Sequence, residues 1–191
     1  MTTFFTADLH LGHQGIIHLC KRPFADVETM DRAIIDRWNA VVGPEDEVWV
    51  IGDFAYRSPK ACPAYLNQLM GIKHLVTGNH DSTYTTRAKG WASVQPFAEI
   101  DVKEDGCAAH VVMCHYALRT WPKIGKGSIN LFGHSHGRLA GYQTAKGGQL
   151  DVGVDAWDYT PASLTQILRR IRTLPVMPGG GDHHYSGEED L

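Results

Sequence analysis

The chain has 191 residues, enough for one domain with a buried core, and 43% of them are hydrophobic while 20% are charged. This is the composition of an ordinary globular protein. The formal net charge of −3 argues against a protein that coats nucleic acid by charge alone, although it leaves room for a nuclease with a local basic patch.

The N-terminus and the cysteines indicate where the protein works. The first residues, MTTFFTADLH, lack the basic start and the apolar stretch of a signal peptide. No apolar run approaches the roughly 20 residues that span a bilayer. The four cysteines form no Cys-x-x-Cys pair and are interpreted as buried free thiols. We therefore expect a cytoplasmic protein with no membrane partner.

Five short apolar runs recur along the chain and are rich in β-branched and aromatic residues. In chain order they read TTFFTAD, EVWVIGD, HLVTGN, HVVMCH and INLFGH. Short runs of this composition are typical of strands that are buried on both faces. They predict the central strands of an α/β protein.

Helical patterns separate the first three runs. Between the first and the second, apolar side chains recur at helical spacing before a Gly-Pro pair that ends the helix. These side chains are Met30, Ile34, Trp38 and Val41. Between the second and the third run, Ser58 and Pro59 predict the start of a helix and Gly71 its end. This alternation implies parallel strands joined by crossovers.

The second half of the chain has a different pattern. The segment AEIDVKEDGCAAHVVMCH predicts an antiparallel hairpin that turns at Asp105 and Gly106. GQLDVGVDAW predicts another strand, and TPASLTQILRRI a last helix that is capped by Ser163. The sum is an α/β sandwich with a mixed sheet.

The end of the chain changes in composition. Prolines, three consecutive glycines and terminal acids cannot form a core. We therefore expect one domain over residues 1–173 and a flexible tail over residues 174–191.

Each of the five apolar runs ends in a side chain that can bind a metal ion. These side chains are Asp8, Asp53, Asn79, His115 and His134, and the second ligands His10 and His136 follow two residues after the first and the last. Since sites in α/β sheets form where loops leave the carboxyl ends of strands, we expect the seven to converge. Residues two apart on an extended backbone point the same way, so both members of each pair should reach one centre.

The donor set indicates the chemistry. Nitrogen and oxygen donors without a thiolate favour Mn, Fe, Zn, Co or Ni over an all-cysteine zinc site. Seven ligands suit two ions that share a carboxylate, and Asp53 is the candidate bridge. Two dications about 3.5–4 Å apart suit in-line phosphoryl displacement. Taken singly, each residue could instead be a cap, a turn residue or a core histidine, and only their joint placement favours a metal site.

The blocks DLH, GDF, GNHD, CH and GHSH, in that order over residues 8–136, resemble the motifs of the calcineurin-like metallophosphoesterases. The opening segment looks most like the small phosphoesterases of bacteria and phages. The resemblance implies a four-layer α/β/β/α sandwich with mixed sheets. It implies two divalent metal ions, manganese favoured, one held by Asp8, His10, Asp53 and His136 and the other by Asp53, Asn79, His115 and His134. It also implies that a hydroxide bridging the metals attacks phosphorus while His80 protonates the leaving oxygen.

One position departs from the family pattern. Many relatives carry a second aspartate shortly after the Gly-Asp pair, and in some it helps to orient the catalytic histidine. Here Tyr56 and Arg57 stand in that segment. Asp81 could orient His80 instead, or it could serve as a cap or as a support outside the ligand shell.

Candidate substrate-binding residues are His13, Arg57 and Arg119. His13 follows the first motif and could face the site, or lie on the surface or in the core. Arg57 could clamp a phosphate with two hydrogen bonds, or remain solvated. The loop LRTWPKIGKGSIN places Arg119 and two lysines beside Trp121, which suits a nucleotide and equally suits a solvated loop with a packed tryptophan.

We expect a dinuclear metal-dependent phosphoesterase with an open site that acts on phosphate esters, above all phosphodiesters or nucleotides. The sequence does not separate monoesterase from diesterase activity. One alternative is a nuclease that acts on DNA or RNA with the same metals. Another is a non-catalytic metal-binding scaffold on the same fold, against which the retained His80 counts. No protein partner can be inferred.

Overall fold

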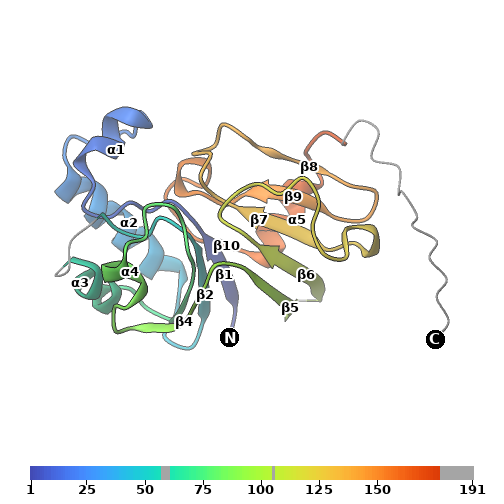
Figure 1. The fold of residues 1–191 in the computed structure, drawn as a ribbon, viewed down its shortest axis with the longest axis horizontal. Coiled ribbons are helices and arrows are strands. Elements are labelled where there is room, and N and C mark those ends of the chain that lie inside the picture. Colours follow the sequence, from blue (N-terminus) through green and yellow to red (C-terminus); the bar gives the residue numbers. More distant parts are fainter. Residues whose placement is uncertain (57–60, 105, 177–191) are drawn as a thin grey trace.

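Two five-stranded sheets pack face to face in the computed structural model, which describes residues 1–56, 61–104 and 106–176. The helices are α1 (Gln14–Leu19), α2 (Val27–Val41), α3 (Ala61–Gln68), α4 (Thr83–Thr86) and α5 (Leu164–Ile171), with short 3-10 helices η1 (Ile124–Lys126) and η2 (Val154–Ala156). The strands are β1 (Thr3–Thr6), β2 (Glu47–Ile51), β3 (Ile72–Val76), β4 (Trp91–Gln95), β5 (Ala98–Glu104), β6 (Cys107–Met113), β7 (Ile129–Phe132), β8 (Gly141–Gln143), β9 (Gly148–Asp151) and β10 (Ala162–Ser163). Helices α1 to α4 lie together on one side of the molecule, away from the second sheet (Figure 1).

The first sheet has the strand order β10-β1-β2-β3-β4. Strands β1 to β4 are parallel, and β10 pairs antiparallel with β1. The predicted strand–helix–strand crossovers are therefore confirmed. Strand β4, which follows α4, has no strong apolar run and was not expected.

The second sheet has the order β5-β6-β7-β9-β8. The predicted hairpin is confirmed, because β5 and β6 pair antiparallel up to Glu104 and Cys107. Strands β6, β7 and β9 are parallel, and the short strand β8 adds an unexpected antiparallel edge. Both sheets are thus mixed, and the expected α/β class is confirmed.

Alternation along the strands builds two hydrophobic cores. Successive side chains of a strand point to opposite faces of its sheet. Phe4 and Val48 therefore belong to the cluster with helices α1 to α3, whereas Phe5 and Trp49 belong to the cluster between the sheets. The prediction of strands buried on both faces holds for β1, β2 and β7, whereas β3 and β6 are buried only toward their C-terminal ends.

The two long helical patterns differ in detail from expectation. In α2, Met30, Ile34 and Trp38 are buried as predicted, but Val41 is exposed and Val42 takes its place in the core. The shift arises because the helix ends at Val41 and the chain becomes extended. Helix α3 ends at Gln68, before the expected stop.

The other features of α3 and the tail fall partly outside the described residues. Ser58 and Pro59, the expected start of α3, lie outside them. Gly71 forms the turn into β3, with a φ of +85°. The expected tail begins with Leu174 and Pro175, whose carbonyl groups accept hydrogen bonds from Gln143. Because residues 177–191 lie outside the described range, the division at residue 173 stays a prediction.

Helix α5 packs against β1 and β10 of the first sheet and against β6, β8 and β9 of the second. Ser163 caps it: its hydroxyl accepts a hydrogen bond from the backbone N–H of Gln166, whose side chain accepts one from the backbone N–H of Ser163. Such a reciprocal capping box satisfies two N–H groups that the helix leaves unpaired. The cap predicted from the sequence is confirmed.

None of the described helices combines the length and the apolar character that crossing a bilayer requires. The four cysteines are free thiols as expected, but only Cys62 is buried and the other three are half-buried, so the expectation of burial is wrong for them.

Replacing Ser163 with alanine should lower the free energy of unfolding by about 1 kcal/mol, because the N–H of Gln166 loses its acceptor. Ser163→Asp is the matched control, since aspartate caps helices equally well. Chemical denaturation of the three proteins measures the difference. Equal losses in the alanine and aspartate variants would contradict a capping role.

Candidate metal centre

The seven predicted ligands meet where strands of both sheets end. Asp8, Asp53 and Asn79 follow β1, β2 and β3 of the first sheet, whereas His115 and His134 follow β6 and β7 of the second. The sheets touch at this edge: Ala7 forms a parallel bridge with Gly153, and Gly133 lies close to Asp8. The convergence predicted from strand order is therefore present, and it joins two sheets rather than one.

Five of the seven predicted ligands have a left-handed backbone. The φ angles are 56° for Asp8, 52° for His10, 56° for Asp53, 66° for His134 and 50° for His136. The sequence-based expectation that each Asp-x-His and His-x-His pair lies on an extended backbone is therefore wrong. Non-glycine residues adopt this conformation rarely, and clusters of them mark sites where the surrounding structure holds the chain in a strained form.

One half of the ligand group gathers Asp8, His10, His136 and Asp53. Donor atoms of the first three all lie within 4.8 Å of one another. The rings of His10 and His136 are stacked with their centroids 5.2 Å apart. His10 Nε2 lies 3.5 Å from Asp53 Oδ2. These four residues thus present their donor atoms to one small volume.

The other half gathers Asn79, His115, His134 and Asp53. The Oδ1 atom of Asn79 lies 3.0 Å from His115 Nε2 and 3.0 Å from His134 Nδ1. His115 Nε2 lies 3.4 Å from Asp53 Oδ2. Asp53 therefore touches both halves, and the same carboxylate oxygen contacts His10 and His115.

Glycines allow this close approach. At Gly52, where φ is +88°, a Cβ atom would lie 2.2 Å from Nδ1 of His115. At Gly133 it would lie 2.7 Å from a carboxylate oxygen of Asp8. A larger residue at either position would displace a ligand.

Burial and charge shift the pKa values in the group. Burial raises the pKa of Asp8 to about 7. Burial lowers the pKa of His10 to about 3. Burial opposes ionisation of both Asp53 and His115, but their mutual hydrogen bond and attraction outweigh it and give a pKa of about 2 for Asp53 and about 9 for His115. Near neutral pH the Asp53–His115 pair is charged and His10 is neutral.

The residues fit divalent cations. His10 Nε2 is buried and has no hydrogen-bond partner, a costly state that a cation at this point would relieve. The N–H at Nδ1 of His115 donates to the carbonyl of Ile51 at 2.9 Å, which directs Nε2 toward Asn79 and Asp53. A nitrogen and oxygen donor set with two buried carboxylates suits the borderline transition metals.

Comparison with known proteins decides the family. The family model of the calcineurin-like phosphoesterases matches residues 1–144. The chain belongs to the calcineurin-like phosphoesterase family. Membership implies hydrolysis of phosphate esters with divalent metal ions.

The chain is also similar to individual proteins. The gene 66 protein of Mycobacterium phage L5 is 28% identical over 181 residues, which cover 81% of this chain and 87% of the phage protein. An uncharacterized protein of Methanocaldococcus jannaschii is 39% identical over 80 residues, covering 41% of this chain and 46% of that protein. The crystal structure of a protein of unknown function from Aquifex aeolicus superposes with a TM-score of 0.64 at 21% identity, covers 87% of this chain and 97% of that chain, and supports the fold alone.

This phosphoesterase carries a buried support that the sequence did not reveal. Arg22, only 4% exposed, donates to both carboxylate oxygens of Asp155 at 2.9 Å and to the carbonyls of Asp8 and Leu9. Asp155 in turn accepts a hydrogen bond from Nδ1 of His136 at 2.8 Å. The support fixes the ring of His136 so that Nε2 remains for a cation, and it holds the strained backbone at Asp8.

A signal for Asp155 exists in the sequence. It follows β9 by four residues, so it lies at the same edge as the ligands. Arg22 stands in a loop without any recognisable pattern. Asp155 also belongs to a potential metal group with Cys20 and His136, but both of its oxygens are already paired with Arg22.

Asp81 supports the loops and does not orient His80 through its side chain. Its carboxylate accepts hydrogen bonds from the backbone N–H groups of Asp53, Phe54 and Gly78 at 2.8–3.0 Å. Of the three roles left open by the sequence, the geometry supports the one outside the ligand shell. His80 is held instead through its own backbone N–H, which donates to Asp53 Oδ1 at 2.8 Å.

The candidate substrate residues have different outcomes. His13 faces the site, with its Nδ1 3.3 Å from Nδ1 of His10. Arg57 lies outside the described residues. Arg119 is exposed, and no hydrogen bond or ion pair within the described ranges joins it to the ligands. Trp121 is buried and donates to the carbonyl of Ser128, so the hypothesis that it stacks on a nucleotide base is wrong.

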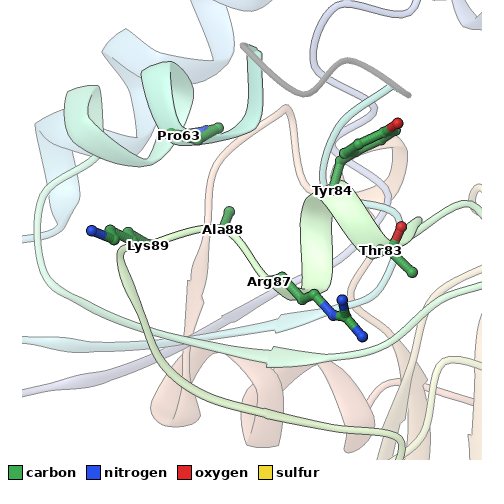
Figure 2. A pocket seen from close by; sticks show the side chains of 6 residues that line it. All are labelled: Pro63, Thr83, Tyr84, Arg87, Ala88 and Lys89. Atoms are coloured by element: carbon green, nitrogen blue, oxygen red, sulfur yellow. The ribbon is translucent and has the colours of Figure 1, made fainter.

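A pocket of about 410 Å³ lies beside helices α3 and α4 and contains none of the ligands. It is lined by Pro63, Thr83, Tyr84, Arg87, Ala88 and Lys89. The charged ends of Arg87 and Lys89 point away from one another (Figure 2). The two cations therefore do not converge on one anion, and the pocket is no second phosphate site on this geometry.

Replacing Asp155 with asparagine should weaken divalent-metal binding about 10- to 100-fold, because an amide cannot hold both Arg22 and His136. Titration calorimetry with Mn²⁺ measures the affinity, and circular dichroism verifies the fold. Asp158→Asn is the matched control, since Asp158 is exposed and pairs only with Arg37 at the surface. Unchanged affinity in a folded Asp155→Asn protein would contradict the positioning role.

Metal binding should release protons from this site. His115, whose pKa is raised to about 9 by Asp53, carries a proton at neutral pH that a cation must displace. The affinity for Mn²⁺ should therefore rise between about pH 6 and about pH 8. Calorimetry at one pH in two buffers of different ionisation enthalpy tests this. Identical heats would show that no proton leaves.

Proposed function

We propose that the protein is a dinuclear metal-dependent phosphodiesterase that hydrolyses phosphodiesters, nucleotides among them. The observation that carries the proposal is the sharing of Asp53 between two groups of donors. The Oδ2 atom of Asp53 lies 3.5 Å from His10 Nε2 and 3.4 Å from His115 Nε2. Five of the seven donor residues, namely Asp8, His10, Asp53, His115 and His136, are buried or half-buried, and a single ion would leave several of the seven donors uncoordinated.

The residues divide into two sets. Asp8, His10, Asp53 and His136 would hold one ion, and Asp53, Asn79, His115 and His134 the other. When bound, two divalent cations would activate water and neutralise charge on the phosphoryl oxygens. Manganese is the metal to test first, and iron, zinc, cobalt and nickel also fit this donor set.

His80 is the proposed general acid. Its backbone is anchored to Asp53, its side chain is exposed, and its ring lies 5.4 Å from the ring of His10. It can therefore reach a substrate oxygen at the mouth of the site without being a ligand. A proton held on the imidazole passes to the leaving oxygen as its bond to phosphorus breaks.

The exposed residues around the site favour a substrate that stays partly in contact with solvent when bound. Asn79 and His80 are both exposed, so the site lies at the surface rather than in an enclosed chamber. His13, whose ring lies 6.5 Å from that of His80, is placed to contact a substituent of the bound phosphate. A surface site suits small phosphodiesters and chain ends.

The direct test is hydrolysis of bis(p-nitrophenyl) phosphate by metal-free protein resupplied with Mn²⁺, beside Asp53→Asn. Turnover that depends on manganese and vanishes in the variant supports the proposal. Metal binding without turnover on this diester or on p-nitrophenyl phosphate would favour a non-catalytic scaffold.

His80→Ala should retain both metal ions and lose about 10²- to 10⁴-fold in kcat, because the leaving oxygen then has no proton donor. Metal content by mass spectrometry and kcat are measured on the same preparation. His18→Ala is the control, since His18 is exposed on α1 and should change neither quantity. Loss of metal in proportion to loss of turnover would make His80 a ligand and overturn this division of roles.

A further inference from the structure

Three tyrosines are exposed in the described part of the chain; Tyr116 touches two proposed ligand histidines, and Tyr56 touches His13, which lies next to the ligand His10. Tyr56 is 47% exposed, Tyr116 is 49% exposed, and Tyr84 is 54% exposed beside the separate pocket of Figure 2. The other described tyrosines are buried or half-buried. Open aromatic surface is thus found directly beside the ligands.

On one side, Tyr56 stacks on His13. Their ring centroids lie 4.4 Å apart and the planes are inclined by 19°. His13 in turn lies 5.3 Å from the ring of His10. Two ring-to-ring steps therefore lead from the surface to a ligand. The stacking holds the Tyr56 ring in place and leaves part of its surface open to solvent.

On the other side, Tyr116 leans against the second half of the ligand group. Its ring lies 4.8 Å from that of His134 and 5.2 Å from that of His115, both edge-on. Edge-to-face contacts of this kind help to fix the ring, and Tyr116 nevertheless remains 49% exposed. The two tyrosines thus flank the centre, one beside His10 and the other beside His134.

We propose that His13, Tyr56 and Tyr116, here called the aromatic rim, bind the nucleobase of a nucleoside phosphodiester by stacking. This inference rests on the proposed phosphodiesterase function and names the substrate class of that same site. A base lies one sugar away from its phosphate, and both rings lie one or two ring contacts away from a ligand. Trp121, which the sequence suggested for base stacking, is buried and cannot stack on a nucleobase.

The rim should accept every base. Recognition through the face of a ring uses a surface that all bases share, whereas discrimination needs hydrogen bonds to base edges. The three side chains offer aromatic faces and few polar atoms. A substrate with an aliphatic group in place of the nucleoside would gain little from them.

Two esters with the same leaving group test the rim: the p-nitrophenyl ester of thymidine 5′-phosphate and methyl p-nitrophenyl phosphate. With Mn²⁺, the protein should have the higher kcat/KM for the thymidine ester. Tyr56→Ala and Tyr116→Ala should each lower kcat/KM for the thymidine ester about 5- to 100-fold more than they lower kcat/KM for the methyl ester. Tyr56→Phe and Tyr116→Phe should keep the preference, since the ring remains.

Tyr84→Ala is the matched control, because Tyr84 is equally exposed and should affect neither ester. Equal kcat/KM for the two esters, or equal losses of kcat/KM on both in the Tyr56→Ala and Tyr116→Ala variants, would overturn the stacking role of the aromatic rim. The proposed phosphodiesterase function would remain intact. If neither ester is hydrolysed, the proposed function fails. The stacking role of the aromatic rim is then tested separately, by measuring calorimetrically how tightly thymidine 5′-phosphate and methyl phosphate bind to the manganese-loaded protein. Tighter binding of the nucleotide that is lost in Tyr56→Ala supports it, and equal binding overturns it.

Discussion

The left-handed backbone at Asp8, His10, Asp53, His134 and His136 is the constraint on which the site depends. Each such residue costs on the order of 1–3 kcal/mol unless its surroundings hold it. The conformation turns the chain sharply as it leaves a strand, so that side chains from separate strands point into one volume. Without it, the same residues would follow the strands outward and would not meet.

The support for this strained backbone comes from charged groups that lie outside the ligand set. Arg22 is not one of the proposed metal ligands. It donates hydrogen bonds to the backbone carbonyls of Asp8 and Leu9. Asp81 holds the segment around Asp53 through backbone N–H groups. The buried Asp151 accepts hydrogen bonds from the hydroxyl of Ser135, which lies between His134 and His136, and from the N–H of Gly137, which follows them. These hydrogen bonds thus hold the loops in place, and the loops in turn position the proposed metal ligands.

Much of the fold, and the meeting of the candidate ligands in one place, could be predicted from the sequence, because apolar runs that end in Asp, Asn or His place those groups at the ends of neighbouring strands. The backbone conformation could not, since residues two apart look the same whether the chain is extended or left-handed. Arg22 gave no signal because its partners are backbone carbonyls and an aspartate far along the chain. Trp121 next to basic residues suggested stacking, but it is buried, with its ring 6.2 Å from that of Tyr142, a residue distant in sequence that a local pattern does not reveal.

The most direct test of the central claim is a crystal structure with Mn²⁺, using the anomalous scattering of the metal. The arrangement predicts two peaks, one on each side of Asp53, with Asn79 and His115 at one and His10 and His136 at the other. A single peak, or a peak between Cys20, His136 and Asp155 in place of these, would contradict a dinuclear centre built around the shared carboxylate.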